Sequence, residues 1–242
     1  MNNADYFVSD VHLAAENPRV SRRFLAFLDQ VKEEGRRLFL LGDIFDLWVG
    51  PKQTRMPYVV PILGKLREVT AAGVEVHYIA GNRDFNFDAR VNGGPPPRHL
   101  PEEMSVEAEG RRLFLTHGDL LCTGDRAYRR VRSIGRSRPV RAAFAGMPLT
   151  LATFLSQGYR RLSGRVVARK PRRETAIDFS RVRAHLLAGH DMVVCGHVHR
   201  AARYRIGLPG ERVGEFVTLG DWNREAVYLV GRAGELLLRK FR

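Results

Sequence analysis

The chain has 242 residues, 44% of them hydrophobic, which is enough for one domain with a sizeable core or one domain with an insertion. Its formal net charge is +14, and its two cysteines, Cys122 and Cys195, exclude a disulfide framework and favour two buried thiols in a reducing compartment. No stretch reaches about 18 apolar residues, and residues 1–5 lack a basic region followed by an apolar run, so neither a membrane span nor a signal peptide is predicted.

The first part of the chain alternates short apolar runs with helical patterns. The runs 6–8, 38–41 and 76–80 are typical of buried strands. Apolar residues at helical spacing predict helices over 18–34 and 56–72, and a glycine ends the second one. This strand–helix order favours parallel pairing of the strands.

The second part begins with a predicted hairpin, because two β-rich runs at 104–108 and 113–116 are joined through Glu109-Gly110-Arg111. Helical patterns follow at 125–134, 157–169 and 174–187, and the apolar stretch 142–155 is expected to be bent or broken at Gly146-Met147-Pro148. Another strand is expected at 192–195. Four short runs close the chain and predict an antiparallel meander: 201–206, 215–219, 226–230 and 236–240. The sequence thus predicts a two-sheet α/β body with a helical insertion near 123–173.

Five polar clusters punctuate the chain, and nearly all directly follow an apolar run. They are Asp10-Val11-His12, Gly42-Asp43, Gly81-Asn82-Arg83-Asp84, His117-Gly118-Asp119 and Gly196-His197-Val198-His199. Active sites of open α/β sheets form at the carboxyl ends of strands, so these side chains are expected at one edge. On an extended strand end, Asp10 and His12 would face the same way.

The side chains of these clusters are typical metal ligands. A single Asp after a strand is more often a turn former, but that interpretation weakens as the clusters accumulate. Nitrogen and oxygen donors without a thiolate suit Mn, Fe or Zn. Two such ions, roughly 3.5–4 Å apart, would clamp the attacking and leaving oxygens of a phosphoryl group.

In order and spacing, the clusters resemble the calcineurin-like metallophosphoesterases, whose pattern is D-x-H, G-D, G-N, H-G-D and G-H-x-H. The resemblance implies their α/β fold, in which two mixed β-sheets pack face to face, flanked by helices. It implies one domain over 1–242, with 123–173 as a helical lid insertion. Asp84 and Asp119 are expected to be structural or to accept hydrogen bonds from metal-bound histidines. The implied ligands are Asp10, His12, Asp43 and His199 for one ion, and Asp43, Asn82, His117 and His197 for the other, with Asp43 bridging.

Arg83 occupies a position where many members of that family have a histidine that protonates an alkoxide leaving group. An arginine side chain cannot act as a general acid, because its pKa exceeds roughly 12, but it can hold phosphate oxygens in a bidentate fork. The reaction should therefore release a group that needs no proton, and a phosphate monoester, with a second pKa of about 6, meets that need. A diphosphate linkage is favoured over a simple phosphodiester.

A narrower resemblance agrees with this choice. Four segments are similar to the UDP-2,3-diacylglucosamine diphosphatase family of lipid A synthesis: 9–13, 81–85, 100–103 and 117–123. The resemblance implies a monomeric hydrolase that converts UDP-2,3-diacylglucosamine to UMP and 2,3-diacylglucosamine 1-phosphate at the cytoplasmic face of the Gram-negative inner membrane. It implies two divalent ions, usually Mn²⁺, with Fe or Zn as alternatives, and a helical insertion over the acyl chains. The implied substrate contacts are Asn82, Arg83, Asp125, Arg169, Arg172 and His197.

The whole excess of positive charge lies in one segment. Residues 126–173 contain fourteen Lys or Arg and no Asp or Glu, whereas the rest of the chain is formally neutral. Apolar residues are interleaved with these charges: Phe144, Met147, Leu149, Leu151, Phe154 and Leu155.

Three interpretations of this segment remain open. Basic amphipathic helices would gain roughly 1 kcal/mol per basic residue near an anionic membrane. A nucleic-acid groove would use the same arginines, but Tyr128 and Tyr159 are the main candidates for base stacking, so no nucleic-acid partner is expected. An ordinary helical subdomain would pack its apolar face inward. The membrane interpretation comes first, with Arg129, Arg132 and Arg136 as expected contacts.

Two other functions compete with the lipid diphosphatase. A dimetal phosphodiesterase acting on nucleotides or nucleic acid would use the same ligands, but Arg83 and the apolar, basic insertion argue against it. A non-catalytic scaffold of the same fold would have lost ligands, and this chain has lost none of the implied set.

Overall fold

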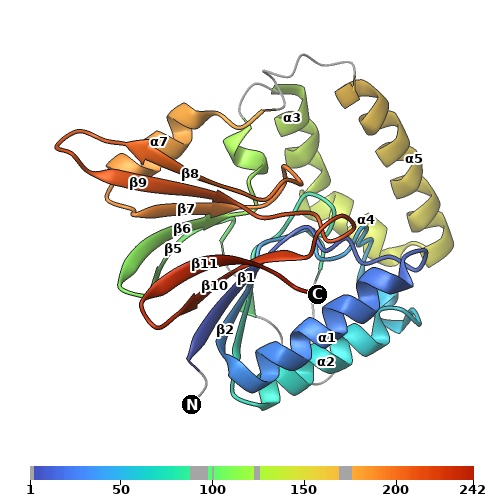
Figure 1. Ribbon diagram of the computed structural model, residues 1–242. Coiled ribbons are helices and arrows are strands. Elements are labelled where there is room, and N and C mark those ends of the chain that lie inside the picture. Colours follow the sequence, from blue (N-terminus) through green and yellow to red (C-terminus); the bar gives the residue numbers. More distant parts are fainter. Residues whose placement is uncertain (1–2, 88–97, 100, 123–125, 169–175) are drawn as a thin grey trace.

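The structure is a computed structural model that describes residues 3–87, 98–99, 101–122, 126–168 and 176–242 (Figure 1). A six-stranded sheet has the order β11-β10-β1-β2-β3-β4. Strands β1 to β4 are parallel, whereas β10 is antiparallel to both β1 and β11. The predicted parallel pairing is therefore confirmed. The bounds are β1 (Ala4–Val8), β2 (Gly35–Leu40), β3 (Glu75–Tyr78), β4 (Arg98–His99), β10 (Val227–Arg232) and β11 (Glu235–Lys240).

A five-stranded sheet has the order β5-β6-β7-β9-β8. The predicted hairpin is present as the antiparallel pair β5–β6, and β6, β7 and β9 are parallel to one another. The bounds are β5 (Glu103–Ala108), β6 (Arg111–Thr116), β7 (Met192–Cys195), β8 (Ala202–Gly207) and β9 (Val213–Thr218). Both sheets are mixed, as the family resemblance implied.

The predicted C-terminal meander is wrong, although all four of its strands exist. β8 and β9 form an antiparallel pair in the five-stranded sheet, whereas β10 and β11 pair in the six-stranded sheet beside β1. The chain crosses between the sheets after β9. The alternation of apolar and polar residues predicts where a strand lies in the sequence. It does not predict which sheet the strand joins, because strand pairing depends on residues far apart in the sequence.

The two sheets pack face to face around a shared core that contains Phe7, Phe39, Leu115, Val194 and Leu229. Helices cover the outer faces. α1 (Pro18–Glu34) and α2 (Val60–Ala71) pack on the six-stranded sheet, and α7 (Phe179–Leu187) packs on the other (Figure 1). This layering holds the strand ends of both sheets in fixed relative positions.

Helix α1 has the predicted bounds and buries the predicted residues. The Asn17 side chain accepts a hydrogen bond from the backbone N–H of Val20 (3.4 Å), and Pro18 occupies the first turn. Helix α2 begins at Val60 instead of residue 56, because the 3₁₀ helix η1 (Pro51–Arg55) precedes it. Val60, the first residue of α2, lies outside the core, and its side chain is 50% exposed. The buried residues of α1 are Val20, Phe24, Phe27, Leu28 and Val31.

In the described part of the chain, three α-helices lie between β6 and α7: α3 (Arg126–Gly135), α4 (Arg138–Gly146) and α5 (Leu149–Ala168). We call residues 126–168 the helical segment, and Figure 1 shows it grouped to one side of the sheets. The predicted break is confirmed, because α4 ends at Gly146 and α5 begins after Pro148. The pattern at 157–169 does not form a separate helix, because α5 includes residues 157–168.

Candidate metal centre

Seven side chains expected to bind metal follow the carboxyl ends of five strands. Asp10 and His12 follow β1, Asp43 follows β2, and Asn82 follows β3 in the six-stranded sheet. His117 follows β6, and His197 and His199 follow β7 in the five-stranded sheet. The two sheets thus deliver their polar loops to one place, as the positions of the clusters predicted.

The backbone at these loops differs from the expected extended conformation. Asp10, His12, Asp43, His197 and His199 all have positive φ angles, between 53° and 68°. Residues other than glycine rarely adopt this region, and such outliers concentrate at functional sites. Asp10 and His12 therefore converge because the chain turns sharply after β1, not because they share one face of a strand.

Asp10, His12 and His199 form the first group of possible ligands. The Oδ1 atom of Asp10 lies 3.6 Å from Nε2 of His12 and 3.7 Å from Nε2 of His199. The two imidazole rings are stacked, with centroids 4.8 Å apart. Both Nε2 atoms thus face one carboxylate oxygen, which is a suitable arrangement for a shared ion.

A second group forms around Asp43, Asn82, His117 and His197. Nε2 of His117 lies 2.9 Å from Oδ1 of Asn82 and 3.8 Å from Oδ1 of Asp43. Nδ1 of His197 lies 3.1 Å from the same Asn82 oxygen. Asp10, Asp43 and His117 also lie within ligand distance of one another. Asp43 is therefore adjacent to both groups, as a bridging ligand requires.

The buried groups of this site favour a bound cation. Burial raises the pKa of Asp10 to about 6, and the neighbouring Asp43 carboxylate adds to this effect. Burial lowers the pKa of His12 and His197 to about 4, so both imidazoles are neutral at pH 7 and offer a lone pair. Among the described residues, Asp10 Oδ1 and His12 Nε2 are buried without a hydrogen-bond partner. These residues fit a divalent ion, because it would satisfy those atoms.

Asp84 holds the Asp43 loop in place. Its carboxylate accepts hydrogen bonds from the backbone N–H groups of Asp43 (3.0 Å), Ile44 (2.7 Å), Phe45 (3.2 Å) and Gly81 (3.1 Å). This matches its expected structural role.

Gly196 allows the β7 loop to approach Asp10 closely. A Cβ atom at this position would overlap Oγ of Ser9 and Oδ2 of Asp10. The backbone N–H of His197 donates to the same Asp10 oxygen (2.8 Å). The absence of a side chain therefore lets one loop orient the ligand of another.

We expect Gly196→Ala to displace Asp10, with a loss of about 1–3 kcal/mol in stability and of metal from the first group. Metal analysis and thermal unfolding of the purified variant would measure both effects. Gly158→Ala in α5 is a matched control, since a Cβ there meets nothing within 4 Å in the part of the chain that the structure describes. That control should retain its metal and gain slightly in stability. Full metal content in Gly196→Ala would contradict the role given to this glycine.

Arg83 lies beside the two groups of ligands. Its Nε atom is 3.4 Å from Oδ2 of Asp43, and its Nη1 atom is 2.5 Å from Oδ1 of Asp46. Its backbone N–H donates to Oδ1 of Asp43 (2.9 Å). The guanidinium is thus positioned where a phosphate group next to Asp43 would come within its reach.

The sequence analysis missed one residue that contacts a histidine of the site. We call the ring nitrogen that points away from the proposed ion the outer nitrogen of each histidine. Nδ1 of His117 lies 2.9 Å from the carbonyl oxygen of Leu41, and Nδ1 of His199 lies 3.3 Å from Oδ2 of Asp221. The hydrogen bond with Asp221 raises the pKa of His199. Residues 216–221 repeat the pattern of an apolar run followed by Gly-Asp, so the signal that located Asp43 was also present here.

The helical segment is attached to this site by arginines expected at a membrane. Arg132 Nε donates to Oδ2 of Asp119 (2.6 Å), and Arg132 Nη2 pairs with Glu102 (3.0 Å). Arg136 pairs with Glu102 and donates to the carbonyl of Gly81 (2.8 Å). Both arginines therefore have acidic partners within the protein, and their membrane role stays a prediction. Asp119 and Glu102, outside the acid-free segment, supply their partners, and Asp119 has the expected structural role. The side chain of Arg129 lies outside the described residues.

The implied substrate contacts are only partly covered by the structure. Asn82, Arg83 and His197 lie together at the site. Asp125, Arg169 and Arg172 lie outside the described residues. Among the helices in the described ranges, none has both the length and the apolar character needed to cross a membrane.

Comparisons with known proteins agree with this geometry. The family model for calcineurin-like phosphoesterases matches residues 6–201. A UDP-2,3-diacylglucosamine hydrolase of Hahella chejuensis is 32% identical over 94% of this chain and 92% of its own. The chain is a calcineurin-like phosphoesterase of the UDP-2,3-diacylglucosamine hydrolase family. Proteins of the same name from Ralstonia nicotianae (35% identical, 90% of this chain and 83% of theirs) and Cellvibrio japonicus (32%, 97% and 98%) extend the match.

The predicted fold of two mixed sheets is therefore confirmed for this chain. Membership of the family also identifies the chain as a metal-dependent hydrolase. The family implies divalent metal ions, for which the groups around Asp10 and Asp43 are the candidate ligands.

Proposed function

We propose that this phosphoesterase hydrolyses the diphosphate bond of UDP-2,3-diacylglucosamine and releases UMP and 2,3-diacylglucosamine 1-phosphate. The main support for this proposal is the position of Arg83, whose Nε atom lies 3.4 Å from Oδ2 of Asp43. Related enzymes with alkoxide leaving groups have a proton donor at this position. The names of the relatives support the same substrate. Asn82, Arg83 and His197 are the described residues that we assign to substrate binding.

The protein side of the mechanism follows from the positions of these residues. Bound divalent ions would supply Lewis acidity and an activated water. Asp10, His12, Asp43, Asn82, His117, His197 and His199 are assigned as their ligands. Arg83 holds the oxygens of the diphosphate and stabilises charge that develops during attack by water. The leaving 1-phosphate departs as an anion, so no side chain has to protonate it.

We propose Mn²⁺ for both ions. The donors are imidazole nitrogens, carboxylates and one amide oxygen, with no thiolate among them. Such a set suits Mn, Fe or Zn, and the resemblance to a family that usually uses Mn²⁺ is our reason for choosing Mn among the three.

The test is the release of UMP from UDP-2,3-diacylglucosamine by the metal-free protein supplied with Mn²⁺, Zn²⁺ or Fe²⁺ in turn. We expect the highest rate with Mn²⁺. Faster hydrolysis of a simple phosphodiester or of single-stranded DNA under the same conditions would favour the alternative phosphodiesterase and overturn the proposal.

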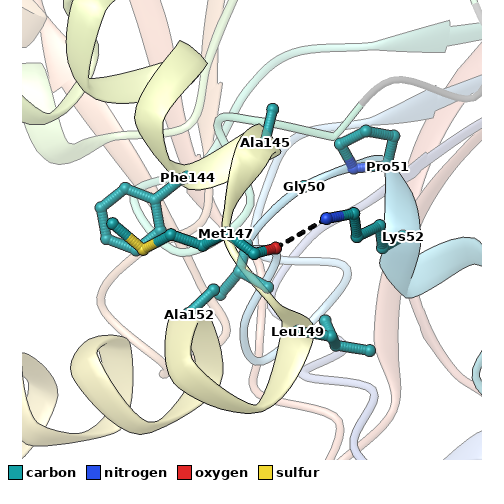
Figure 2. A pocket seen from close by; sticks show the side chains of 9 residues that line it. Gly50, Pro51, Lys52, Phe144, Ala145, Met147, Leu149 and Ala152 are labelled. Atoms are coloured by element: carbon teal, nitrogen blue, oxygen red, sulfur yellow. Dashed lines mark hydrogen bonds between the residues drawn. The ribbon is translucent and has the colours of Figure 1, made fainter.

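We assign the helical segment as part of a lid over residues 123–173 that covers the acyl chains. Its apolar side chains Ile134 (64% exposed) and Phe154 (72% exposed) lack cover from the body of the protein. Figure 2 shows its attachment at the junction of α4 and α5, where Lys52 Nζ donates to the carbonyl of Met147 (2.8 Å). Phe144, Met147 and Leu149 line a small pocket there, against the loop that contains Gly50.

The same segment is proposed to hold the enzyme peripherally at the anionic cytoplasmic face of the inner membrane. With Arg132 and Arg136 turned toward the body, the exposed arginines Arg130, Arg138 and Arg141 are the described candidates. They lie on α3 and α4 near the exposed Ile134, so charge and apolar surface occur together.

Substituting Leu151, Phe154 and Leu155 by serine should raise KM for the acylated substrate by about tenfold or more, because several apolar contacts worth about 1 kcal/mol or more each are lost. Hydrolysis of a small unacylated phosphodiester should remain near wild type. Equal losses of activity on the acylated and the unacylated substrate would mean that the segment is ordinary packing.

Reversing the charge of Arg130, Arg138 and Arg141 should instead weaken binding to anionic vesicles, with less effect at high salt.

A further inference from the structure

The four histidines of the metal centre differ in what their outer nitrogens contact. Within the described residues, His199 is the only one of them whose outer nitrogen is hydrogen-bonded to a carboxylate, through Oδ2 of Asp221 at 3.3 Å. His117 uses the backbone carbonyl of Leu41, and the corresponding nitrogen of His12 lies 3.8 Å from Oδ1 of Asp46, beyond hydrogen-bond range. The first metal group thus has a charged support that His117 lacks.

Asp221 is rigidly placed. Its Oδ1 atom accepts hydrogen bonds from the backbone N–H of Asn223 (2.8 Å) and from the Asn223 amide (2.9 Å). The next residue, Trp222, is fully buried against Phe24 and Phe27, and its backbone N–H donates to the carbonyl of Asp10 (3.1 Å). The crossover from β9 to β10 therefore fixes Asp221 relative to both Asp10 and His199.

This placement determines which nitrogen of His199 can bind metal. The carboxylate of Asp221 accepts the proton on Nδ1, which leaves the lone pair on Nε2. Nε2 is the atom that faces Asp10 Oδ1, at 3.7 Å. A carboxylate acceptor also makes the imidazole a stronger donor, and loss of such a partner typically costs 10–100-fold in metal affinity.

We propose that Asp221 is a positioning residue for the metal ion held by Asp10, His12 and His199, and that it strengthens this site without acting on the other. Asp221 lies outside the five polar clusters, on a crossover that belongs to neither sheet. The proposal rests on the metal ligands assigned under the proposed function, but not on the identity of the substrate.

Calorimetric titration of the metal-free protein with Mn²⁺ tests the proposal without any substrate. We expect wild type to bind two ions per chain. In Asp221→Ala, one dissociation constant should rise about 10–100-fold, while the other stays within about threefold. Asp221→Asn keeps the shape and an acceptor oxygen but loses the charge, so its one affected constant should rise less. Asp191→Asn is the control, because Asp191 accepts a backbone N–H from Arg112 ahead of β7. It should leave both constants unchanged.

The outcomes distinguish failure of the Asp221 proposal from a general folding effect and from a wrong ligand assignment. Two unchanged constants in Asp221→Ala, or equal rises in both, would overturn the proposal, since equal rises indicate a general effect on folding. Thermal unfolding of the metal-free variants measures that effect directly. If Asp221→Ala does not fold, Asp221→Asn decides: a rise in one constant supports the proposal, and two unchanged constants overturn it. Fewer than two ions bound to wild type would overturn the ligand assignment and this proposal together, whatever the substrate.

Discussion

Asp43→Ala is expected to purify without either metal ion and to retain less than about 0.1% of wild-type activity, a loss of more than about 4 kcal/mol in transition-state stabilisation. Asp43 is 1% exposed, lies within ligand distance of Asp10 and His117, and is the one carboxylate assigned to both ions. Its removal deprives both sites of a negative charge at once. Metal content by mass spectrometry and UMP release measure the two effects.

His12→Ala provides the matched comparison, because His12 belongs only to the first group of ligands. That variant should lose most of one ion and keep the other. Asp43→Asn, which preserves the side-chain volume, tests whether the loss in Asp43→Ala comes from charge or from a cavity. Occupancy by two ions in Asp43→Ala would exclude Asp43 as a bridge.

The location of the site was predictable because it depends on a local pattern. An apolar run that ends in Gly, Asp or His marks the end of a buried strand. Parallel strands bring such ends to one edge. The five clusters therefore identified Asp10, Asp43 and His117 as neighbours, although these residues are far apart in the chain. Helix α1 was predictable for the same reason, because its cap at Asn17 and the spacing of its apolar residues are both features of one short segment.

Other features were not predictable because they depend on distant partners. The positive φ angles of Asp10 and Asp43 arise where loops from different strands crowd around the same point. Arg132 and Arg136 belong to a segment without acidic residues, so their sequence neighbourhood favoured solvent or membrane. Their carboxylate partner Glu102 precedes β5 and approaches α3 only in the folded protein. A count of charges along a segment does not show where those charges point.

Asp221 was missed for a different reason. Its Gly-Asp pattern follows β9, but the sequence analysis interpreted this run only as one strand of an antiparallel meander. β9 is in fact parallel to β7, so its carboxyl end lies at the same edge as His199. The parallel pairing of β9 with β7, which the meander did not include, therefore adds one residue to the site.

Arg83→Ala is expected to lose activity on UDP-2,3-diacylglucosamine by about 100-fold or more, the usual effect of removing one donor that stabilises transition-state charge. The structure sharpens the expectation for metal binding. Arg83 places a positive charge 3.4 Å from Asp43, so its removal should leave Mn²⁺ affinity unchanged or slightly stronger. Titration calorimetry and UMP release on the same preparation measure both. Arg83→Lys should recover only part of the activity, since an ammonium cannot form the bidentate fork.

Arg83→His provides the sharper test of why an arginine stands at this position. A histidine there can protonate a leaving alkoxide, so the variant should gain activity on a phosphodiester with an alkyl leaving group while it loses activity on the diphosphate. The ratio of kcat/KM for the two substrates should therefore shift toward the phosphodiester in Arg83→His but not in Arg83→Ala. An arginine that served only to hold phosphate oxygens of any ester would give the same ratio in both variants. Near wild-type rates on the diphosphate in Arg83→Ala would remove the physical reason for preferring that substrate.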